Sequence, residues 1–196
     1  MNSNAPTSTQ KYVARIQQDI VIQNIFKRIA SVQINKKMSN ELMSYFITSR
    51  DLASPGHYDY GVNVKFINPG NDIRNCLGAM MKIQGYRDRV CEIQVNLLEA
   101  KRILKSGLAL GTRHVYEMYA VEVKSRGVGE YQKAFIATIF SPLQSRLNIV
   151  DTQLDQVEAI LQNLDKAHFA YRSVAEIGSK LVDRMEGGRS VISARA

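Results

Sequence analysis

The stretch CLGAMMKIQGYRDRVCEIQVNLLEAKRIL, residues 76–104, repeats apolar side chains in alternate steps of three and four residues. The stretch LQSRLNIVDTQLDQVEAILQNLDKAHFAY, residues 143–171, has the same rhythm and the same length. Each covers 28 residue steps, which is roughly 42 Å of helix at about 1.5 Å per residue. A mean spacing of about 3.5 residues marks a helix face that packs against another helix. The two stretches therefore predict a pair of coiled-coil arms.

The apolar positions of the arms define a predicted seam, the face along which one helix packs against another. Its main members on the first arm are Ile83, Tyr86, Val90, Ile93, Leu97 and Leu104, and on the second arm Leu143, Leu147, Val150, Leu154, Val157, Leu161, Leu164 and Tyr171. Smaller or polar members are Cys76, Ala79, Ala100 and His168. Burying one Leu or Ile contributes about 1.5–3 kcal/mol, so we expect this seam to serve packing and oligomerisation.

Several apolar residues of the arms fall off the seam. They are Met81, Leu98 and Ile103 on the first arm and Ile149, Ile160 and Phe169 on the second. A two-helix hairpin leaves such residues uncovered, so we expect them to meet the N-terminal helices or another subunit.

Equal arm length and a short connector favour two arms that fold back on each other in antiparallel fashion, because each seam needs a partner of matching length. The predicted fold is mainly α: an elongated antiparallel helical hairpin with arms at about 72–107 and 141–186. A small helical N-terminal region precedes it, in residues 1–70. A flexible tail, residues 187–196, is expected after Gly187 and Gly188.

The connector between the arms, residues 112–140, has a different pattern. The segments HVYEMYAVEV (114–123) and AFIATIF (134–140) are rich in β-branched and aromatic residues, and SRGVG (125–129) supplies two glycines. This composition predicts a β-hairpin. The alternative is a second arm that extends backward, since Ile136 and Phe140 also fit its register. The start SPLQ (141–144) is typical of a helix N-terminus and favours a new helix at residue 141.

In the N-terminal region, apolar residues from Val13 to Val32 predict a helix, and a second short helix follows Ser39 or Asn40. Residues 58–67 alternate through Val62, Val64 and Phe66, which predicts a short strand before a turn at residues 68–70.

The net charge is +8 and is unevenly distributed. Lys and Arg exceed Asp and Glu by seven to three in residues 1–56 and by seven to four in 72–111, whereas 141–186 has five against seven. A basic excess attracts nucleic acid or complements an acidic neighbour. The candidate nucleic-acid contacts are Lys27, Arg28, Lys36, Lys37, Arg74, Lys82, Arg87 and Arg89, with Tyr12, Tyr45, Tyr58 and Tyr60 as candidates for base stacking.

The sequence has no uninterrupted apolar run of 18 residues, and its first ten residues lack the features of a signal peptide. We therefore expect no membrane span and a location in the cytoplasm or within an assembled particle. Cys76 and Cys91 lie about 22 Å apart along one predicted helix, too far for a disulfide between them.

No catalytic residue, metal site or cofactor site is predicted. His57, His114 and His168 lack metal-ligand spacing, and the glycines of residues 107–112 lack the lysine of a phosphate-binding loop. Asp151, Asp155 and Glu158 share a helix face, which we interpret as solvated or as paired with basic residues of the first arm. The sequence does not predict an enzyme.

Three classes of function fit these patterns. The first is a structural or assembly protein that self-associates through long helices, as in a filament or a phage particle. The second is an oligomeric accessory protein that binds single-stranded nucleic acid, similar in role to a recombination mediator. The third is a chaperone whose paired arms end in a client-binding tip, an architecture shared by prefoldin-like proteins.

Overall fold

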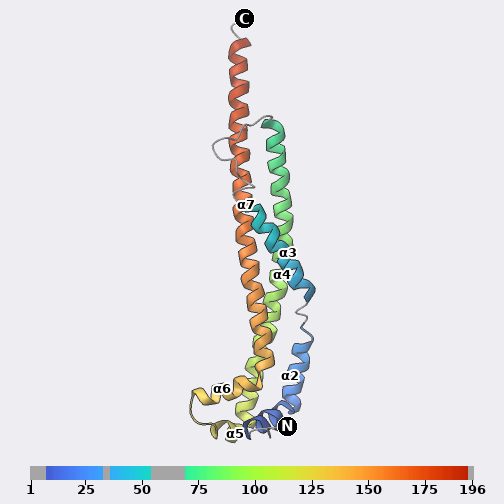
Figure 1. Cartoon of the computed structure of the whole chain (residues 1–196), viewed down its shortest axis with the longest axis vertical. Coiled ribbons are helices and arrows are strands. Elements are labelled where there is room, and N and C mark those ends of the chain that lie inside the picture. The colour runs from blue at the N-terminus through green and yellow to red at the C-terminus, as the bar shows by residue number, and fades with distance from the viewer. Residues whose placement is uncertain (1–7, 33–35, 54–68, 194–196) are drawn as a thin grey trace, which may run out of the picture. The chain divides into compact units, whose positions relative to one another are not determined.

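The computed structural model describes residues 8–32, 36–53 and 69–193, with only the backbone for 36–38, 69–72 and 186–193. Its elements are all helices: α1 (Ser8–Gln17), α2 (Ile20–Ala30), α3 (Lys36–Leu52), α4 (Pro69–Met118), α5 (Ala120–Lys124), α6 (Glu130–Ile139) and α7 (Ser141–Ser193) (Figure 1). The predicted helical class is confirmed, and none of the described residues lies in a strand. The strand predicted at 58–67 falls outside them.

The two long helices, α4 and α7, pack antiparallel, which confirms the predicted arrangement of the arms. Both are longer than predicted. Helix α4 begins at Pro69 and runs beyond residue 107 to Met118. Proline is favourable in the first turn of a helix, where its missing N–H has no partner to lose. Helix α7 starts at Ser141, as predicted, but continues through both glycines at 187–188 to Ser193.

The chain divides into two compact units, and each takes part of both long helices. Unit 1 comprises residues 1–36 and 95–154, with α1, α2, α5, α6, the second half of α4 and the start of α7. Unit 2 comprises residues 37–94 and 155–196, with α3, the first half of α4 and the rest of α7. Helices α1 and α2 therefore belong to unit 1, and α3 belongs to unit 2.

The predicted β-hairpin is wrong. Residues 112–118 continue α4, and α5 and α6 follow. In α6 the buried residues are Phe135, Ile136 and Ile139, a helical spacing that places them on one face. The β-branched and aromatic composition misled the prediction because packing of an amphipathic helical face outweighs strand propensity. The two predicted turn glycines do form a turn: Gly127 and Gly129 have φ values of 105° and 60°, which favour glycine.

The core of unit 1 is formed where α1, α2 and α6 meet the long helices. Its buried residues are Ile16, Ile22, Ile29, Leu97, Ala100, Leu104, Val115, Val123, Phe135, Ile136, Ile139, Phe140, Leu143, Leu147 and Val150. Polar contacts join the same helices. Gln17 of α1 donates to the Ile139 carbonyl at 2.9 Å, and Arg146 of α7 donates to the Ile29 carbonyl at the end of α2 at 2.6 Å.

Arg126, in the turn after α5, links α1 to α6. Its guanidinium donates to the Thr9 hydroxyl at 3.0 Å and lies 4.8 Å from the Tyr12 ring centroid and 5.3 Å from that of Phe135. A planar guanidinium can pack on aromatic rings with its face while its N–H groups donate hydrogen bonds at its edge.

Two glycines of α4 allow close helix packing in unit 1. A Cβ at Gly107 would lie 2.8 Å from the Cδ1 atom of Ile29 in α2. A Cβ at Gly111 would lie 2.6 Å from the ring of Phe140, which is fully buried between α6 and α7. The first arm was predicted to end at about residue 107, but Gly107 and Gly111 instead admit neighbouring side chains against a continuous helix.

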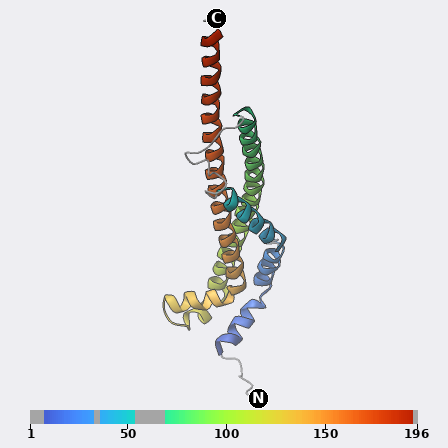
Figure 2. The ribbon, with the colours of Figure 1, turned by 45° about the horizontal axis from the view of Figure 1, so that its top comes forward.

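In unit 2, α3 crosses α4 at an oblique angle, and the chain runs in opposite directions in the two helices (Figures 1 and 2). Arg89 of α4 donates to Glu41 at 3.0 Å, and the Tyr45 and Tyr86 rings meet edge to face at 5.9 Å. Leu42 of α3 is fully buried.

The glycines of α4 differ in a way that predicts opposite effects on stability. A Cβ at Gly85 would meet nothing within 4 Å, so Gly85→Ala should stabilise the helix by about 0.5–1 kcal/mol. Gly111→Ala has the same intrinsic gain, but it pushes a methyl group into the Phe140 ring, and such overpacking costs about 1–3 kcal/mol. We expect a lower midpoint of thermal unfolding for Gly111→Ala and a higher one for Gly85→Ala, measured by circular dichroism. Equal midpoints would contradict the close approach of Phe140.

Candidate functional site

The first arm buries most of its predicted seam residues. Ile83, Val90, Ile93, Leu97 and Leu104 are buried, as are Cys76 and Ala100. Ala79 is half-buried, whereas Tyr86 is 36% exposed. Cys91 is half-buried, and no disulfide joins it to Cys76.

On the second arm some predicted seam positions are buried, and at three others the buried residue lies one position earlier. Leu143, Leu147, Val150, Val157 and Leu164 are buried as members of the seam. Leu154, Leu161, His168 and Tyr171 are only half-buried. Gln153, Ile160 and Ala167, each one position earlier, are buried instead. Both series keep steps of three and four, and the polar Gln153 made the neighbouring leucine series the more plausible one in the sequence.

The off-seam apolar residues have different environments. Ile160 is fully buried in α7 and so belongs to the packed face. Ile103 is half-buried and lies beside Ile25 and Ile29 of α2, as expected for contact with an N-terminal helix. Met81, Leu98, Ile149 and Phe169 remain exposed. These four are available for contacts with other molecules.

The acidic face of α7 shows the pairing expected from the sequence at one position. Asp151 pairs with Lys101 of α4 at 2.7 Å, and further along α7 Asp165 pairs with Arg87 at 2.6 Å. Asp155 and Glu158 are exposed. Within the described ranges, no group of three His, Cys, Asp or Glu side chains is arranged to hold a metal ion.

A polar cluster centred on Asp19 joins the α1–α2 junction to the end of α4. Asp19 Oδ1 accepts hydrogen bonds from the Val21 and Ile22 backbone N–H groups at 2.8 and 3.3 Å and lies 3.2 Å from His114 Nε2. The Tyr119 hydroxyl donates to Oδ2 at 2.8 Å. Asp19 therefore caps α2 and at the same time ties it to α4.

These contacts change the acidity of the groups. Burial raises the pKa of the Asp19 carboxyl, but the hydrogen bonds from Tyr119, His114 and the α2 backbone outweigh it and hold the pKa below 3.8. Burial and the bond to Asp19 raise the pKa of Tyr119 above 10.0. A carboxylate with both oxygens engaged acts as a structural acceptor.

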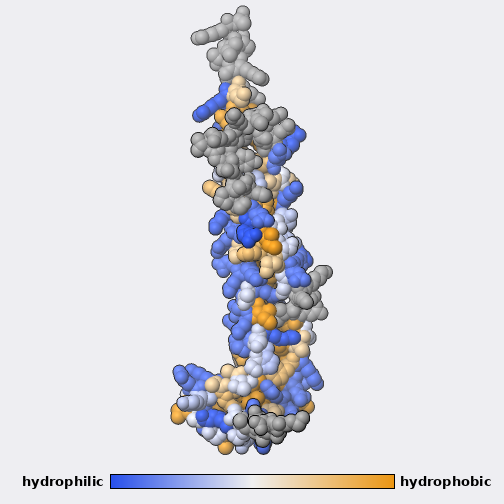
Figure 3. Space-filling view, in the orientation of Figure 1, coloured by the Kyte–Doolittle hydropathy of each residue, from blue (hydrophilic) through white to orange (hydrophobic). Residues whose placement is uncertain are grey.

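Exposed apolar residues adjoin the members of this cluster in the sequence. Ile20 and Val21 follow Asp19, Met118 precedes Tyr119, and Val121 precedes Glu122, which pairs with Arg15 at 3.9 Å. The exposed fractions are 73% for Ile20, 41% for Val21, 66% for Met118 and 78% for Val121. We call these four residues the end surface. The space-filling view shows hydrophobic residues among hydrophilic ones at the end of unit 1 where α5 and α6 lie (Figure 3).

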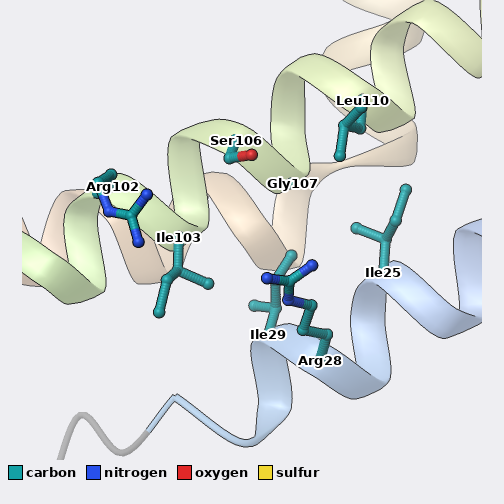
Figure 4. Close-up of a pocket in the computed structure, with 8 residues that line it drawn as sticks. All are labelled: Ile25, Arg28, Ile29, Arg102, Ile103, Ser106, Gly107 and Leu110. Atoms are coloured by element: carbon teal, nitrogen blue, oxygen red, sulfur yellow. The ribbon is translucent and has the colours of Figure 1, made fainter.

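A small cavity lies between α2 and α4, beside Gly107. Figure 4 shows Ile25 and Ile29 of α2 facing the α4 turn that contains Gly107, with Arg28 beside Ile29 and Arg102 toward one side on α4. Its volume is about 70 Å³, which is enough for a few waters and too small for an ordinary ligand. Arg102 is engaged by Glu99 through two hydrogen bonds of 2.7 and 2.8 Å.

The structure separates the candidate nucleic-acid contacts into groups. Arg87 pairs with Asp165, and Arg89 pairs with Glu41 and Glu92. Arg28 lies beside the small α2–α4 cavity, and Lys27 is exposed. Arg74 and Lys82 line one larger cavity of unit 2 together. The side chains of Lys36 and Lys37 lie outside the described ones.

The candidate stacking tyrosines lie in different surroundings. Tyr12 packs against Arg126 and Tyr45 against Tyr86, whereas Tyr58, Tyr60 and His57 lie outside the described residues. Sequence reasoning missed the Asp19 cluster, although Asp before the apolar run Ile20–Ile22 is a helix N-cap signal.

Comparison of the chain with models of protein families, with curated proteins and with solved structures finds no significant match. Of the helices that the structure describes, none is long and apolar enough to cross a membrane.

The Asp19 cluster predicts a pH-dependent contribution to stability. Asp19→Asn keeps a side chain that caps helices well but removes the charge, so we expect the free energy of unfolding at pH 7 to fall by about 1–2 kcal/mol. Because the folded-state pKa of Asp19 lies below its unfolded value, the charge stabilises the fold above that unfolded value. This contribution is lost as pH falls through the folded-state pKa.

The difference between wild type and Asp19→Asn should therefore shrink between about pH 5 and pH 2. Urea denaturation at several pH values measures it. A difference that stays constant over this range would show that the charge of Asp19 does not stabilise the fold.

Proposed function

We propose that this chain is a non-enzymatic assembly protein, in which the packed helices form a scaffold and the end surface binds a further copy of the same chain. The observation that carries the proposal is the exposure of Ile20, Val21, Met118 and Val121, three of them more than 60% exposed, next in sequence to residues that one polar cluster holds together. Contiguous exposed apolar side chains with a polar rim mark a protein interaction site.

The charges beside the end surface support a second copy as its partner. Arg15 pairs with Glu122 at 3.9 Å, Arg113 pairs with Glu117 at 3.3 Å, and Lys124 lies two residues after Glu122, so both signs are present. In a two-fold interface the same patch faces itself, and a patch of one sign would repel its copy. A mixed rim permits pairing of opposite charges across such an interface.

The end surface supplies the apolar centre of an interface, which for a stable complex covers roughly 800 Å² on each partner. Val128 in the turn after α5 and Tyr131 at the start of α6 are 86% and 73% exposed. Exposed side chains of α7, such as Ile149 and Phe169, offer further contacts for a larger assembly.

The test is the mass of the protein in solution, measured by light scattering across a dilution series. We expect wild type to exceed the 22.1 kDa of one chain and the double variant Met118→Lys, Val121→Lys to fall to that mass. A lysine at the end of α4 is compatible with its helix dipole, so circular dichroism should be unchanged.

The matched control is Val95→Lys, Leu98→Lys, which places the same charges on exposed apolar residues of α4 elsewhere in unit 1. We expect this control to keep the wild-type mass. A monomeric wild type, or a loss of mass in the control alone, contradicts the proposed interface. If the end-surface variant instead keeps its mass but stops protecting an unfolded client from aggregation, the chaperone hypothesis is favoured.

A further inference from the structure

Unit 2 contains an open cavity of about 390 Å³. Most of its wall is one face of α4, Thr48 and Leu52 of α3 form another part, and Tyr171 of α7 completes it. Its volume lies within the range of roughly 300–1,000 Å³ that is usual for small-molecule sites. It is large enough for one nucleotide.

The cavity is positively charged. Arg74 and Lys82 line it, and they lie eight residues apart on α4, about two helical turns. Among the side chains that the structure describes, the lining contains no Asp or Glu, and no carboxylate pairs with either cation. Two cations without a counter-charge favour an anionic ligand.

Two tyrosines give the cavity aromatic surfaces. Tyr86 is held by its edge-to-face contact with Tyr45, at 5.9 Å, and still exposes about a third of its side chain. Tyr171 lines the cavity from α7. A fixed aromatic ring beside a basic groove is the arrangement that stacks a base while cations contact the phosphate.

Small and polar side chains shape the rest of the site. A Cβ at Gly78 would meet nothing within 4 Å, so the absent side chain leaves open space on the cavity wall. Asn75 and Thr48 bring an amide and a hydroxyl, groups that hydrogen-bond to base edges or to sugar oxygens.

We propose that this cavity binds a nucleotide unit, with Arg74 and Lys82 contacting the phosphate and Tyr86 and Tyr171 contacting the base. The unit is either a free nucleotide or one residue of a single strand, because the chemistry is the same. An acidic peptide satisfies the two cations but makes no use of the tyrosines, and for this reason we favour the nucleotide. The inference does not depend on the end surface, which belongs to unit 1.

The sharpest test fills the cavity without weakening the helix. Gly78→Leu places a side chain into the open space, and leucine is a better helix former than glycine. Gly85→Leu is the matched control, because Gly85 lies two turns further along α4, also faces open space and does not line the cavity. The probes are fluorescein-labelled oligothymidylate, followed by anisotropy, and thymidine monophosphate, followed by calorimetry.

We expect wild type and Gly85→Leu to bind alike and Gly78→Leu to bind at least tenfold more weakly, with a thermal midpoint no lower than that of wild type. Arg74→Ala, Lys82→Ala should also weaken binding. For binding of the oligothymidylate, the Arg74→Ala, Lys82→Ala variant should reduce the slope of log affinity against log salt concentration by about 1.4. This is about 0.7 for each lost phosphate contact. The control is Lys166→Ala, Lys180→Ala, which removes two exposed charges of α7 that do not line the cavity.

Binding of both probes with this dependence on Gly78 supports a free nucleotide as a ligand, and binding of the oligonucleotide alone supports a strand. The proposal is overturned if wild type binds neither probe or if Gly78→Leu binds as tightly as Gly85→Leu. The proposal is also overturned if polyglutamate displaces the probes as effectively as unlabelled oligothymidylate does. The site would then recognise negative charge alone.

Discussion

The apolar contact between α4 and α7 is the interaction on which the other contacts depend. Neither helix is stable in water with such a face exposed, and each buried aliphatic side chain adds about 1.5–3 kcal/mol. In both units this contact is reinforced by an ion pair across the helices, Lys101 with Asp151 in unit 1 and Arg87 with Asp165 in unit 2. The pairs are partly exposed and add little energy compared with the apolar face, but they fix which residues oppose each other.

The N-terminal helices are attached to this framework by a few specific contacts. Helix α2 approaches α4 closely because Gly107 has no side chain, and Asp19 connects the start of α2 to His114 and Tyr119. Helix α3 is held on α4 through Glu41 and Tyr45. The end surface and the cavity are both products of this attachment, since each is lined by an N-terminal helix and by α4.

The sequence predicted the long helices and their antiparallel pairing because periodicity over many turns is a strong signal. It did not predict α5 and α6, because Val, Ile, Phe and Tyr favour strands locally and only the tertiary contacts of Phe135 and Phe140 show them to be helical. Part of the buried series on α7 was predicted correctly, but Leu154 was chosen in place of Gln153, because Gln153 is polar and Leu154 is not. The eight basic candidates were identified by charge alone, whereas their ion pairs depend on which helices meet.

The matched spacing of the two ion pairs limits how the length of this chain can change. Arg87 and Lys101 are 14 residues apart on α4, and Asp151 and Asp165 are 14 apart on α7. One residue inserted between them in either helix would rotate the following part by about 100° and turn its apolar face toward water. We therefore expect matched changes of seven residues in both helices to disturb this register least. Changes of other lengths belong in the turns, such as the one at Gly127 and Gly129.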